Sequence, residues 1–277
     1  MMCRELDCAG RIVVLDRPRI MGILNVTPDS FSDGGKWLGV SEAVEHALAM
    51  QDEGADIIDV GGESTRPGAE AVDLQQELDR VIPVIESIAS KLKVPVSIDT
   101  SKPEVMRAAV AAGAGMINDV YALRQEGAVA AAADLGVPVC LMHMQGEPRV
   151  MQDNPVYKDV GNDVLHFLLE QAMVCNLNGI PQNNIVLDPG FGFGKNLQQN
   201  IDLFHALPGL VAAGYPVMVG VSRKSMIGQL TGKELADRMP GSITAAALAS
   251  RAGAAIVRVH DVAATHDALS IAFALQT

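Results

Sequence analysis

The stretch IMGILNVTPDSFSDGG, residues 20–35, decides the fold. Its first five residues are apolar or Gly without polar alternation, which is typical of a strand covered on both faces in a parallel sheet. A loop of Asp, Ser and Gly follows, and no second strand comes at hairpin distance. Apolar residues then recur at helical spacing over 41–53, and Ser41 is the expected N-cap of that helix. The unit is therefore strand, polar loop and helix.

The same unit recurs along the whole chain. Strands are predicted at 20–24, 56–60, 94–98, 115–118, 137–142, 184–187, 215–221 and 255–259. Helices are predicted at 41–53, 74–91, 103–113, 126–135, 158–178, 197–206, 241–253 and 262–275. Eight such units without a composition break predict a single α/β domain over 1–277, a (β/α)8 TIM barrel, and a doubly wound open sheet is the alternative. A short N-terminal hairpin within 4–19 is expected to plug the bottom of the barrel.

Composition and charge exclude several classes of protein. The formal net charge is −12, whereas a protein that binds nucleic acid needs a broad basic face. The four cysteines form no C-x-x-C pair, which fits a reducing cytoplasm. Charged residues occupy the N-terminal region where a secretory signal would be apolar, and no apolar run approaches 18 residues. We therefore expect a cytoplasmic protein with no nucleic-acid or membrane partner.

A polar residue follows or ends every predicted strand. These residues are Asn25, Asp59, Asp99, Asn118, His143, Asp188, Ser222 and, on the last strand, Arg258 and His260. Barrel enzymes build their sites at the carboxyl ends of the strands, whereas a structural surface tolerates polar residues anywhere. The pattern therefore predicts one site at that end of the barrel.

The last strand and the first strand predict an anion site. Arg258 and His260 are two residues apart and share a face, and barrel closure would place Asn25 beside them. Two cationic groups and an amide suit a phosphate-sized anion, and Asn25 can also ligate Mg²⁺. The alternative for His260 is a core histidine that a neighbour satisfies.

Three further residues predict a site for a flat heterocycle. Asp99, Asn118 and Asp188 would face inward from nearby strands, where unpartnered polar groups are costly. Carboxylates accept paired N–H bonds and an amide both donates and accepts, so this group suits an amino-pyrimidinone edge. The alternative is a polar cavity filled with water.

Two loops add charge and small residues. In GVSRKS, residues 220–225, Ser222 is the expected cap of a helix turn, and the free N–H groups of such a turn could seat a carboxylate. Arg223 and Lys224 add positive charge to this seat. The alternative is that both are solvated surface cations. GGESTRPGA, residues 61–69, carries Arg66 and is expected to form a mobile lid.

DPGFGFGK, residues 188–195, does not fit the phosphate-loop frame, because Pro189 and Asn196 stand where that frame needs Gly and Ser or Thr. Its glycines suit a close approach of backbone to the flat ligand, with Phe191 or Phe193 as a wall.

Taken in order, the motifs of this chain resemble those of the dihydropteroate synthases of the folate pathway. The motifs are GILNVTPDSFSDGG, DVGGESTRPGA, VSIDTSKPEV, INDV, CLMHMQG, LDPGFGFGKN, GVSRKSMIG and IVRVHDV, and they run from about residue 20 to residue 263. Each motif alone is modest evidence, but eight of them in sequence are highly specific.

The resemblance implies a (β/α)8 transferase that joins 6-hydroxymethyl-7,8-dihydropterin pyrophosphate to 4-aminobenzoate and releases pyrophosphate with Mg²⁺. It assigns the pterin to Asp99, Asn118, Asp188 and Lys224; the pyrophosphate to Asn25, Arg258 and His260, with Asn25 on the metal; and the aminobenzoate to Phe31, Thr65, Arg66, Pro67, Ser222 and Arg223. The expected catalytic residues are Asp33, Arg66, Lys224, Arg258 and His260. The resemblance also implies a homodimer and, because Phe31, Pro67 and Ser222 match the usual pattern, sensitivity to sulfonamides.

Three other functions are weighed against this one. A pterin-binding methyltransferase domain would use the heterocycle group but would need neither an anion site nor a carboxylate seat. A Schiff-base aldolase would use Lys224, and a pterin carrier would bind ligand without releasing pyrophosphate. The combined presence of Asn25, Ser222, Arg258 and His260 argues against all three.

Overall fold

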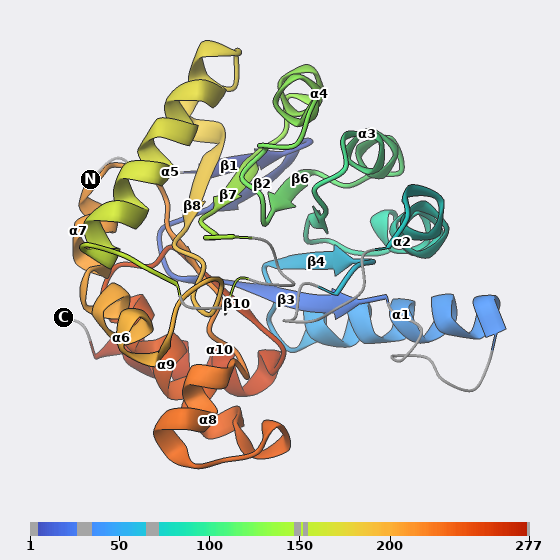
Figure 1. The fold of residues 1–277 in the computed structure, drawn as a ribbon. Coiled ribbons are helices and arrows are strands. Elements are labelled where there is room, and N and C mark those ends of the chain that lie inside the picture. Colours follow the sequence, from blue (N-terminus) through green and yellow to red (C-terminus); the bar gives the residue numbers. More distant parts are fainter. Residues whose placement is uncertain (1–4, 27–34, 65–71, 147–150, 152–154, 276–277) are drawn as a thin grey trace.

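In the computed structural model, an outer layer of helices surrounds a barrel of parallel strands (Figure 1). The structure describes residues 5–26, 35–64, 72–146, 151 and 155–275, and only the backbone over 35–38. The strands are β1 (Glu5–Cys8), β2 (Arg11–Val14), β3 (Arg19–Asn25), β4 (Ile57–Gly61), β5 (Val96–Asp99), β6 (Met116–Asp119), β7 (Val139–Met142), β8 (Ile185–Asp188), β9 (Met218–Val219) and β10 (Ile256–Val259). The helices are α1 (Gly35–Asp52), α2 (Leu74–Ala89), α3 (Pro103–Ala111), α4 (Ala128–Leu135), α5 (Val160–Leu177), α6 (Leu197–His205), α7 (Leu207–Ala212), α8 (Ser225–Thr231), α9 (Met239–Arg251) and α10 (Val262–Ala274), with short 3₁₀ turns η2 (Gln182–Asn184) and η3 (Leu235–Asp237).

The strand order confirms the predicted barrel. β3 to β10 form one parallel sheet in the order β8-β7-β6-β5-β4-β3-β10-β9. An isolated parallel bridge between Leu187 and Val217 joins the two ends, β8 and β9. The first and last strands of the barrel are neighbours, so Asn25 and Arg258 come to adjacent strands as expected.

The interior of the barrel has an apolar layer at the amino ends of the strands. This layer consists of Met21, Ile57, Met116, Cys140, Val186, Met218 and Ile256, all buried. The antiparallel hairpin β1–β2 covers it with Leu6, Cys8 and Val13, which confirms the predicted plug. The next inward position of each strand lies two residues further on, which sets the polar residues of the site above this layer.

The largest boundary differences from the predictions are the start of α1 and the extent of β9. α1 begins at Gly35, six residues before the expected cap Ser41, which lies exposed within the helix. Serine favours an N-cap but is tolerated on an exposed helix face, so its presence does not mark a start. β9 has only two residues where 215–221 was predicted, because Pro216 has no N–H to donate to a strand ladder.

None of the described helices is long and apolar enough to span a bilayer. Among the described cysteines, Cys8, Cys140 and Cys175 are buried free thiols.

Candidate active site

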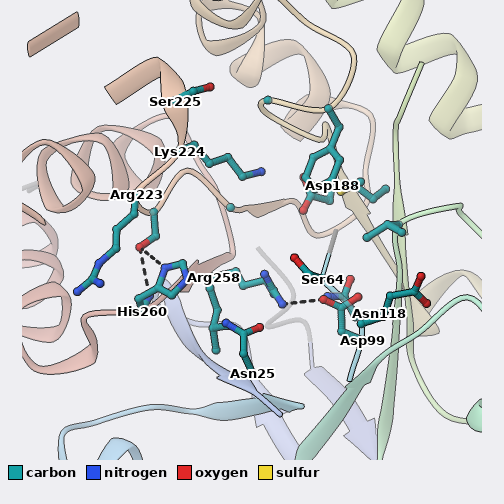
Figure 2. Close-up of a pocket in the computed structure, with 18 of the residues that line it drawn as sticks. Asn25, Ser64, Asp99, Asn118, Asp188, Arg223, Lys224, Ser225, Arg258 and His260 are labelled. Carbon is teal, nitrogen blue, oxygen red and sulfur yellow. Dashed lines mark hydrogen bonds and ion pairs between the residues drawn. The ribbon is translucent and has the colours of Figure 1, made fainter. Parts of the chain in front are cut away.

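A cavity of about 740 Å³ opens at the carboxyl ends of the barrel strands. Its wall includes Asn25, Ser64, Asp99, Asn118, Asp188, Ser222, Lys224, Arg258 and His260. Figure 2 shows the side chains of Asp99, Asn118, Asp188, Lys224 and Arg258 around one common space. The structure thus brings the two predicted groups, for an anion and for a heterocycle, into one cavity, where Asp99 of the second group is paired with Arg258 of the first.

Arg258 forms a fork between the fully buried Asp59 and the partly buried Asp99 at the floor of the cavity. Its Nε donates to Asp59 Oδ2 at 2.6 Å and its Nη2 to Asp99 Oδ2 at 2.7 Å. Asn118 Nδ2 also donates to Asp59 Oδ2, at 3.0 Å. Burial raises the pKa of the Asp99 carboxyl to about 7, against the opposing charge of Arg258. Burial alone would lower the pKa of Arg258, but Asp59 and Asp99 raise it, so the guanidinium stays charged.

Asp59 is a site residue to which the sequence assigned no role. It is fully buried in the middle of β4, beneath the cavity, and it links Arg258 to Asn118. Its position two residues after Ile57 of the apolar layer was the available signal, because that spacing places it on the inward face.

Asp188 and Lys224 line the same cavity as Arg258. Asp188 Oδ1 accepts the N–H of Gly190 at 2.7 Å, and burial raises the pKa of Asp188 against the charge of Lys224. Lys224 Nζ donates to the carbonyl of Phe191 and lies 4.4 Å from the centre of the Phe193 ring. Burial lowers the pKa of Lys224 to about 8. Phe191 itself is buried in the core, so Phe193 is the ring at the cavity.

The loop after β8 is folded tightly against β7. Gly190 has φ +67°, and a Cβ there would lie 1.9 Å from the carbonyl oxygen of His143. His143 faces away from the cavity and its Nδ1 lies 3.0 Å from the buried Lys195 Nζ, which also donates to Gly190 O at 2.8 Å and Phe193 O at 2.9 Å. His143 and Lys195 therefore shape the loop that carries Phe193.

Ser222 does not cap a helix as expected. α8 begins three residues later, at Ser225. Arg223 has a left-handed backbone (φ +57°), which turns the chain before the helix can begin. Ser222 Oγ instead lies 3.0 Å from His260 Nδ1 and accepts the backbone N–H of His260 at 3.2 Å.

Arg223 points away from the cavity centre (Figure 2). Its Nε and Nη2 donate to the two carboxylate oxygens of Asp261 at 3.0 Å and 2.5 Å. Its backbone N–H donates to Ser242 Oγ at 2.8 Å. The guanidinium that was expected around the aminobenzoate ring is therefore held by an ion pair at the rim.

Five predicted site residues lie outside the residues that the structure describes. They are Phe31, Asp33, Thr65, Arg66 and Pro67. The predicted lid and the first loop therefore stay predictions.

Sequence analysis also missed a cluster of polar side chains that includes Glu63, the residue before Ser64. Glu63, Glu77, Thr100 and Lys102 are joined by hydrogen bonds and ion pairs, although Glu63 and Lys102 are 39 residues apart. A signal was present in α2, because Glu77 lies in line with the apolar residues of its buried face.

Comparison with known proteins places this geometry in a family. The profile of the family described as "Pterin binding enzyme" matches residues 21–260. The dihydropteroate synthase of Escherichia coli K12 is 51% identical over 267 residues, which cover 96% of this chain and 95% of that protein. A Xanthomonas albilineans dihydropteroate synthase solved with 4-aminobenzoic acid has a TM-score of 0.95 at 56% identity, covering 100% of this chain and 99% of that chain. A Yersinia pestis dihydropteroate synthase solved with a sulfonamide drug complex has a TM-score of 0.93 at 49% identity, with 98% of each chain covered.

Proposed function

Because the chain belongs to the dihydropteroate synthase family of pterin-binding enzymes, which are transferases, we propose that it joins 6-hydroxymethyl-7,8-dihydropterin pyrophosphate to 4-aminobenzoate. The observation that carries the proposal is that one cavity is lined by Asp99, Asn118, Asp188 and Lys224 together with Arg258, His260 and Ser222. The first set of residues suits the heterocycle and the second suits the anionic groups, so both substrates can meet in this cavity.

The pterin would lie against Asp99, Asn118, Asp188 and Lys224. A buried carboxylate such as Asp188 gains by accepting two parallel N–H bonds from an amino-pyrimidinone edge, because burial without such donors disfavours its charge. Lys224 can donate to the ring carbonyl, and Phe193 offers its face to the flat ring.

The pyrophosphate would lie against Arg258, His260 and Asn25. Among the described residues, none accepts a hydrogen bond from Arg258 Nη1, so this amino group can meet a phosphate oxygen while Nε and Nη2 stay on the carboxylates. Asp59 and Asp99 thus hold the guanidinium in one orientation before substrate binds, which is the preorganisation that electrostatic catalysis needs.

The carboxylate of 4-aminobenzoate would be received by Ser222. A hydroxyl can accept two hydrogen bonds and donate one. If His260 carries its proton on Nδ1, Ser222 Oγ accepts from both the ring and the backbone of His260, and its own proton is left for the carboxylate.

Asn25 is the residue that would hold Mg²⁺. A Cβ built on Gly61 would lie 4.0 Å from Asn25 Oδ1 and 3.8 Å from Asp99 Oδ2, so both oxygens border the same space. Mg²⁺ usually takes one or two protein oxygens together with substrate phosphates and waters, and this donor set fits that pattern. When bound, the ion would neutralise charge on the departing pyrophosphate.

The proposed reaction needs no strong base. The bond between the pterin methylene carbon and the pyrophosphate oxygen breaks with its electron pair on the oxygen, and the aniline nitrogen then bonds to the carbon and loses a proton to solvent. Arg258 and His260 would hold the leaving charge while the residues that bind the heterocycle fix the ring beside the amine. A cytoplasmic location is part of the same proposal, and the free thiols of Cys8, Cys140 and Cys175 support it.

The decisive assay mixes the protein with the dihydropterin pyrophosphate, 4-aminobenzoate and Mg²⁺ and follows pyrophosphate release together with formation of dihydropteroate. Asp188→Asn is the matched variant, because it keeps the shape of the side chain but offers one acceptor in place of two. We expect turnover in the wild type and a large loss in the variant. Tight pterin binding without pyrophosphate release would indicate a carrier, and borohydride trapping of a carbonyl substrate on Lys224 would indicate an aldolase.

Sulfonamides should inhibit the enzyme in competition with 4-aminobenzoate, because they present an aniline and an anionic group of similar shape. The Yersinia pestis relative was solved in a sulfonamide complex. Inhibition that 4-aminobenzoate does not relieve would contradict the shared site.

A further inference from the structure

A lysine side chain is buried in the loop that follows β8. Lys195 is 2% exposed, and it is not among the described residues that line the cavity. In the part of the chain that the structure describes, no carboxylate forms an ion pair with it. Burying an amino group is costly unless its protons are hydrogen-bonded. The groups that Lys195 holds should therefore explain its presence.

The Nζ atom of Lys195 has three partners. It donates to the carbonyls of Gly190 at 2.8 Å and Phe193 at 2.9 Å, and it lies 3.0 Å from His143 Nδ1. An ammonium has one proton for each of these groups. Burial lowers the pKa of Lys195 well below its usual range, and a neutral amine would keep the same contacts by accepting Nδ1–H of His143. In either protonation state, Lys195 ties two carbonyls of one loop to the residue that follows β7.

The loop over 189–194 depends on side chains for its shape, because it contains neither a helix nor a strand. Two lysines bind three of its carbonyls. Lys195 binds those of Gly190 and Phe193, and Lys224 binds that of Phe191. Without Lys195, two of these three anchors would be lost.

The same loop touches two groups that line the cavity. The N–H of Gly190 donates to Asp188 Oδ1 at 2.7 Å, and the carbonyl of Phe191 accepts from Lys224 Nζ. The ring of Phe193 lies 4.4 Å from the same Nζ atom. Figure 2 shows the Lys224 side chain extending toward Asp188. A shift of this loop would therefore change the hydrogen bonds of both side chains.

Arg258 does not depend on this loop. Its guanidinium is held by Asp59 on β4 and Asp99 on β5. Loss of Lys195 should therefore disturb the two side chains that the loop touches and leave the guanidinium in place.

We propose that Lys195 is a positioning residue that acts through the loop over 189–194 and sets Asp188 and Lys224 for binding of the heterocycle. This inference rests on the proposed function, since it takes the dihydropterin as that heterocycle. Lys195 touches no substrate in this arrangement, and its whole effect passes through the backbone of the loop.

The test compares Lys195→Met and Lys195→Gln with one control. Methionine fills the same buried space without a donor, and its introduction leaves no carboxylate of an ion pair without its cation. Glutamine restores an amide donor to the loop. Arg11→Met is the matched control, because Arg11 also donates to two main-chain carbonyls, those of Ala89 and Val94, but it lies in the hairpin at the other end of the barrel.

Each variant is measured for thermal unfolding, for kcat and the KM of the dihydropterin pyrophosphate at saturating 4-aminobenzoate, and for amide exchange over 189–194. Lys195→Met should unfold within a few degrees of the wild type, yet its KM should rise about tenfold, which is the scale of one displaced hydrogen bond to a charged group. Its kcat should change less than about threefold, because Arg258 stays in place, and the loop amides should exchange faster.

The conservative variant and the control separate positioning from stability. Lys195→Gln should lie between Lys195→Met and the wild type in both KM and exchange. Arg11→Met should match the wild type in both, whatever it loses in unfolding temperature.

An unchanged KM or an unchanged exchange rate over 189–194 in Lys195→Met would overturn the proposal. Failure of both Lys195 variants to fold would overturn it as well, because Lys195 would then stabilise the core instead of positioning the loop. If the wild type releases no pyrophosphate, the proposed function fails, and calorimetric binding of the dihydropterin pyrophosphate together with loop exchange still decides the role of Lys195.

Discussion

Arg258 combines a structural and a chemical task in one side chain. Its guanidinium is the partner of Asp59, which is fully buried, and it also faces the cavity. Its residue type and its spacing of two residues from His260 predicted that it faces the site. Its carboxylate partners, however, lie 199 and 159 residues away in the sequence. From sequence alone, Arg258→Ala is expected to lower turnover while sparing the fold, and the ion pairs argue otherwise.

We predict that Arg258→Ala lowers both turnover and stability. Removing one partner of a buried ion pair typically costs about 3–5 kcal/mol, because a charge is left buried without compensation. Loss of a preorganised contact to the leaving group costs about 3 kcal/mol of barrier in addition. Urea unfolding and steady-state kinetics measure the two effects.

The double variant Arg258→Ala with Asp59→Asn separates the loss of stability from the loss of turnover. It should recover part of the unfolding free energy, since the fully buried Asp59 no longer carries an unpaired charge and only Asp99 has lost its cation, and it should recover no turnover. Recovery of turnover would remove Arg258 from the leaving-group site.

The lowered pKa of Lys224 predicts how activity falls on the alkaline side of the pH profile. Burial lowers its pKa to about 8, so the side chain is a charged donor below this pH and neutral above it. Because kcat/KM reports the free enzyme, kcat/KM for the pterin substrate should fall as the pH rises through about 8. On the acid side, burial raises the pKa of Asp99 to about 7, so activity should also fall below that pH as this carboxylate becomes neutral.

Lys224→Arg tests the assignment, because guanidinium stays protonated throughout this range. The alkaline limb should move to higher pH in this variant even if the maximum is lower. A limb that stays near pH 8 would show that another group titrates there.

At the scale of elements, the inward face of each strand was predictable, and α2, α3, α6 and α10 begin at the predicted residue, whereas the starts of α1 and α8 were not predictable. Strand geometry fixes a two-residue period, so an apolar residue and the polar residue two positions later face inward together. This holds for Ile57 and Asp59, Val186 and Asp188, and Ile256 and Arg258. The start of α1 before Ser41 and the late start of α8 depend instead on backbone turns and tertiary contacts that short windows of sequence do not contain. The pairing of Lys102 with Glu63 and Glu77 escaped for the same reason.

The hairpin β1–β2 should contribute to stability without contributing to the site. Leu6 is buried against the apolar layer at the end of the barrel opposite the cavity, so Leu6→Ala should lower the unfolding free energy by about 2–5 kcal/mol. Both KM values of the folded variant should stay at the wild-type level. The measurements are denaturant unfolding and substrate kinetics at a temperature where the variant is folded.

Ile12→Ala in the same hairpin is the matched control, because Ile12 is 50% exposed and its truncation should lower the unfolding free energy only slightly. Equal losses in the two variants would argue that the hairpin does not seal the barrel through Leu6.

At the scale of the whole molecule, the barrel separates stability from chemistry along its axis. One end is closed by the hairpin over an apolar layer, and the other carries buried charges in pairs around the cavity. The sequence predicted this difference between the two ends because alternate residues of the same strands form both the apolar layer and the polar site. It could not predict which charges pair across the barrel, since those distances depend on the register of all the strands together.

The outer helices α9 and α10 carry a prediction about assembly. α9 and α10 pack against each other and still expose large apolar side chains, with Leu248 52% and Ile271 62% exposed. Apolar surface on neighbouring helices is typical of a contact between subunits. We therefore expect a homodimer through α9 and α10, as the family resemblance implies, with twice the 29.2 kDa chain mass by light scattering after size exclusion.

Leu248→Glu with Ile271→Glu should shift this species to the monomer, because the dimer would have to bury two charges per chain without partners. Met173→Glu on α5 is the matched control, since Met173 is also exposed (58%) but lies on a different helix of the outer layer. It should leave the mass unchanged. A monomeric wild type at micromolar concentration, or an equal loss of dimer in the control, would contradict the assignment of the interface to α9 and α10.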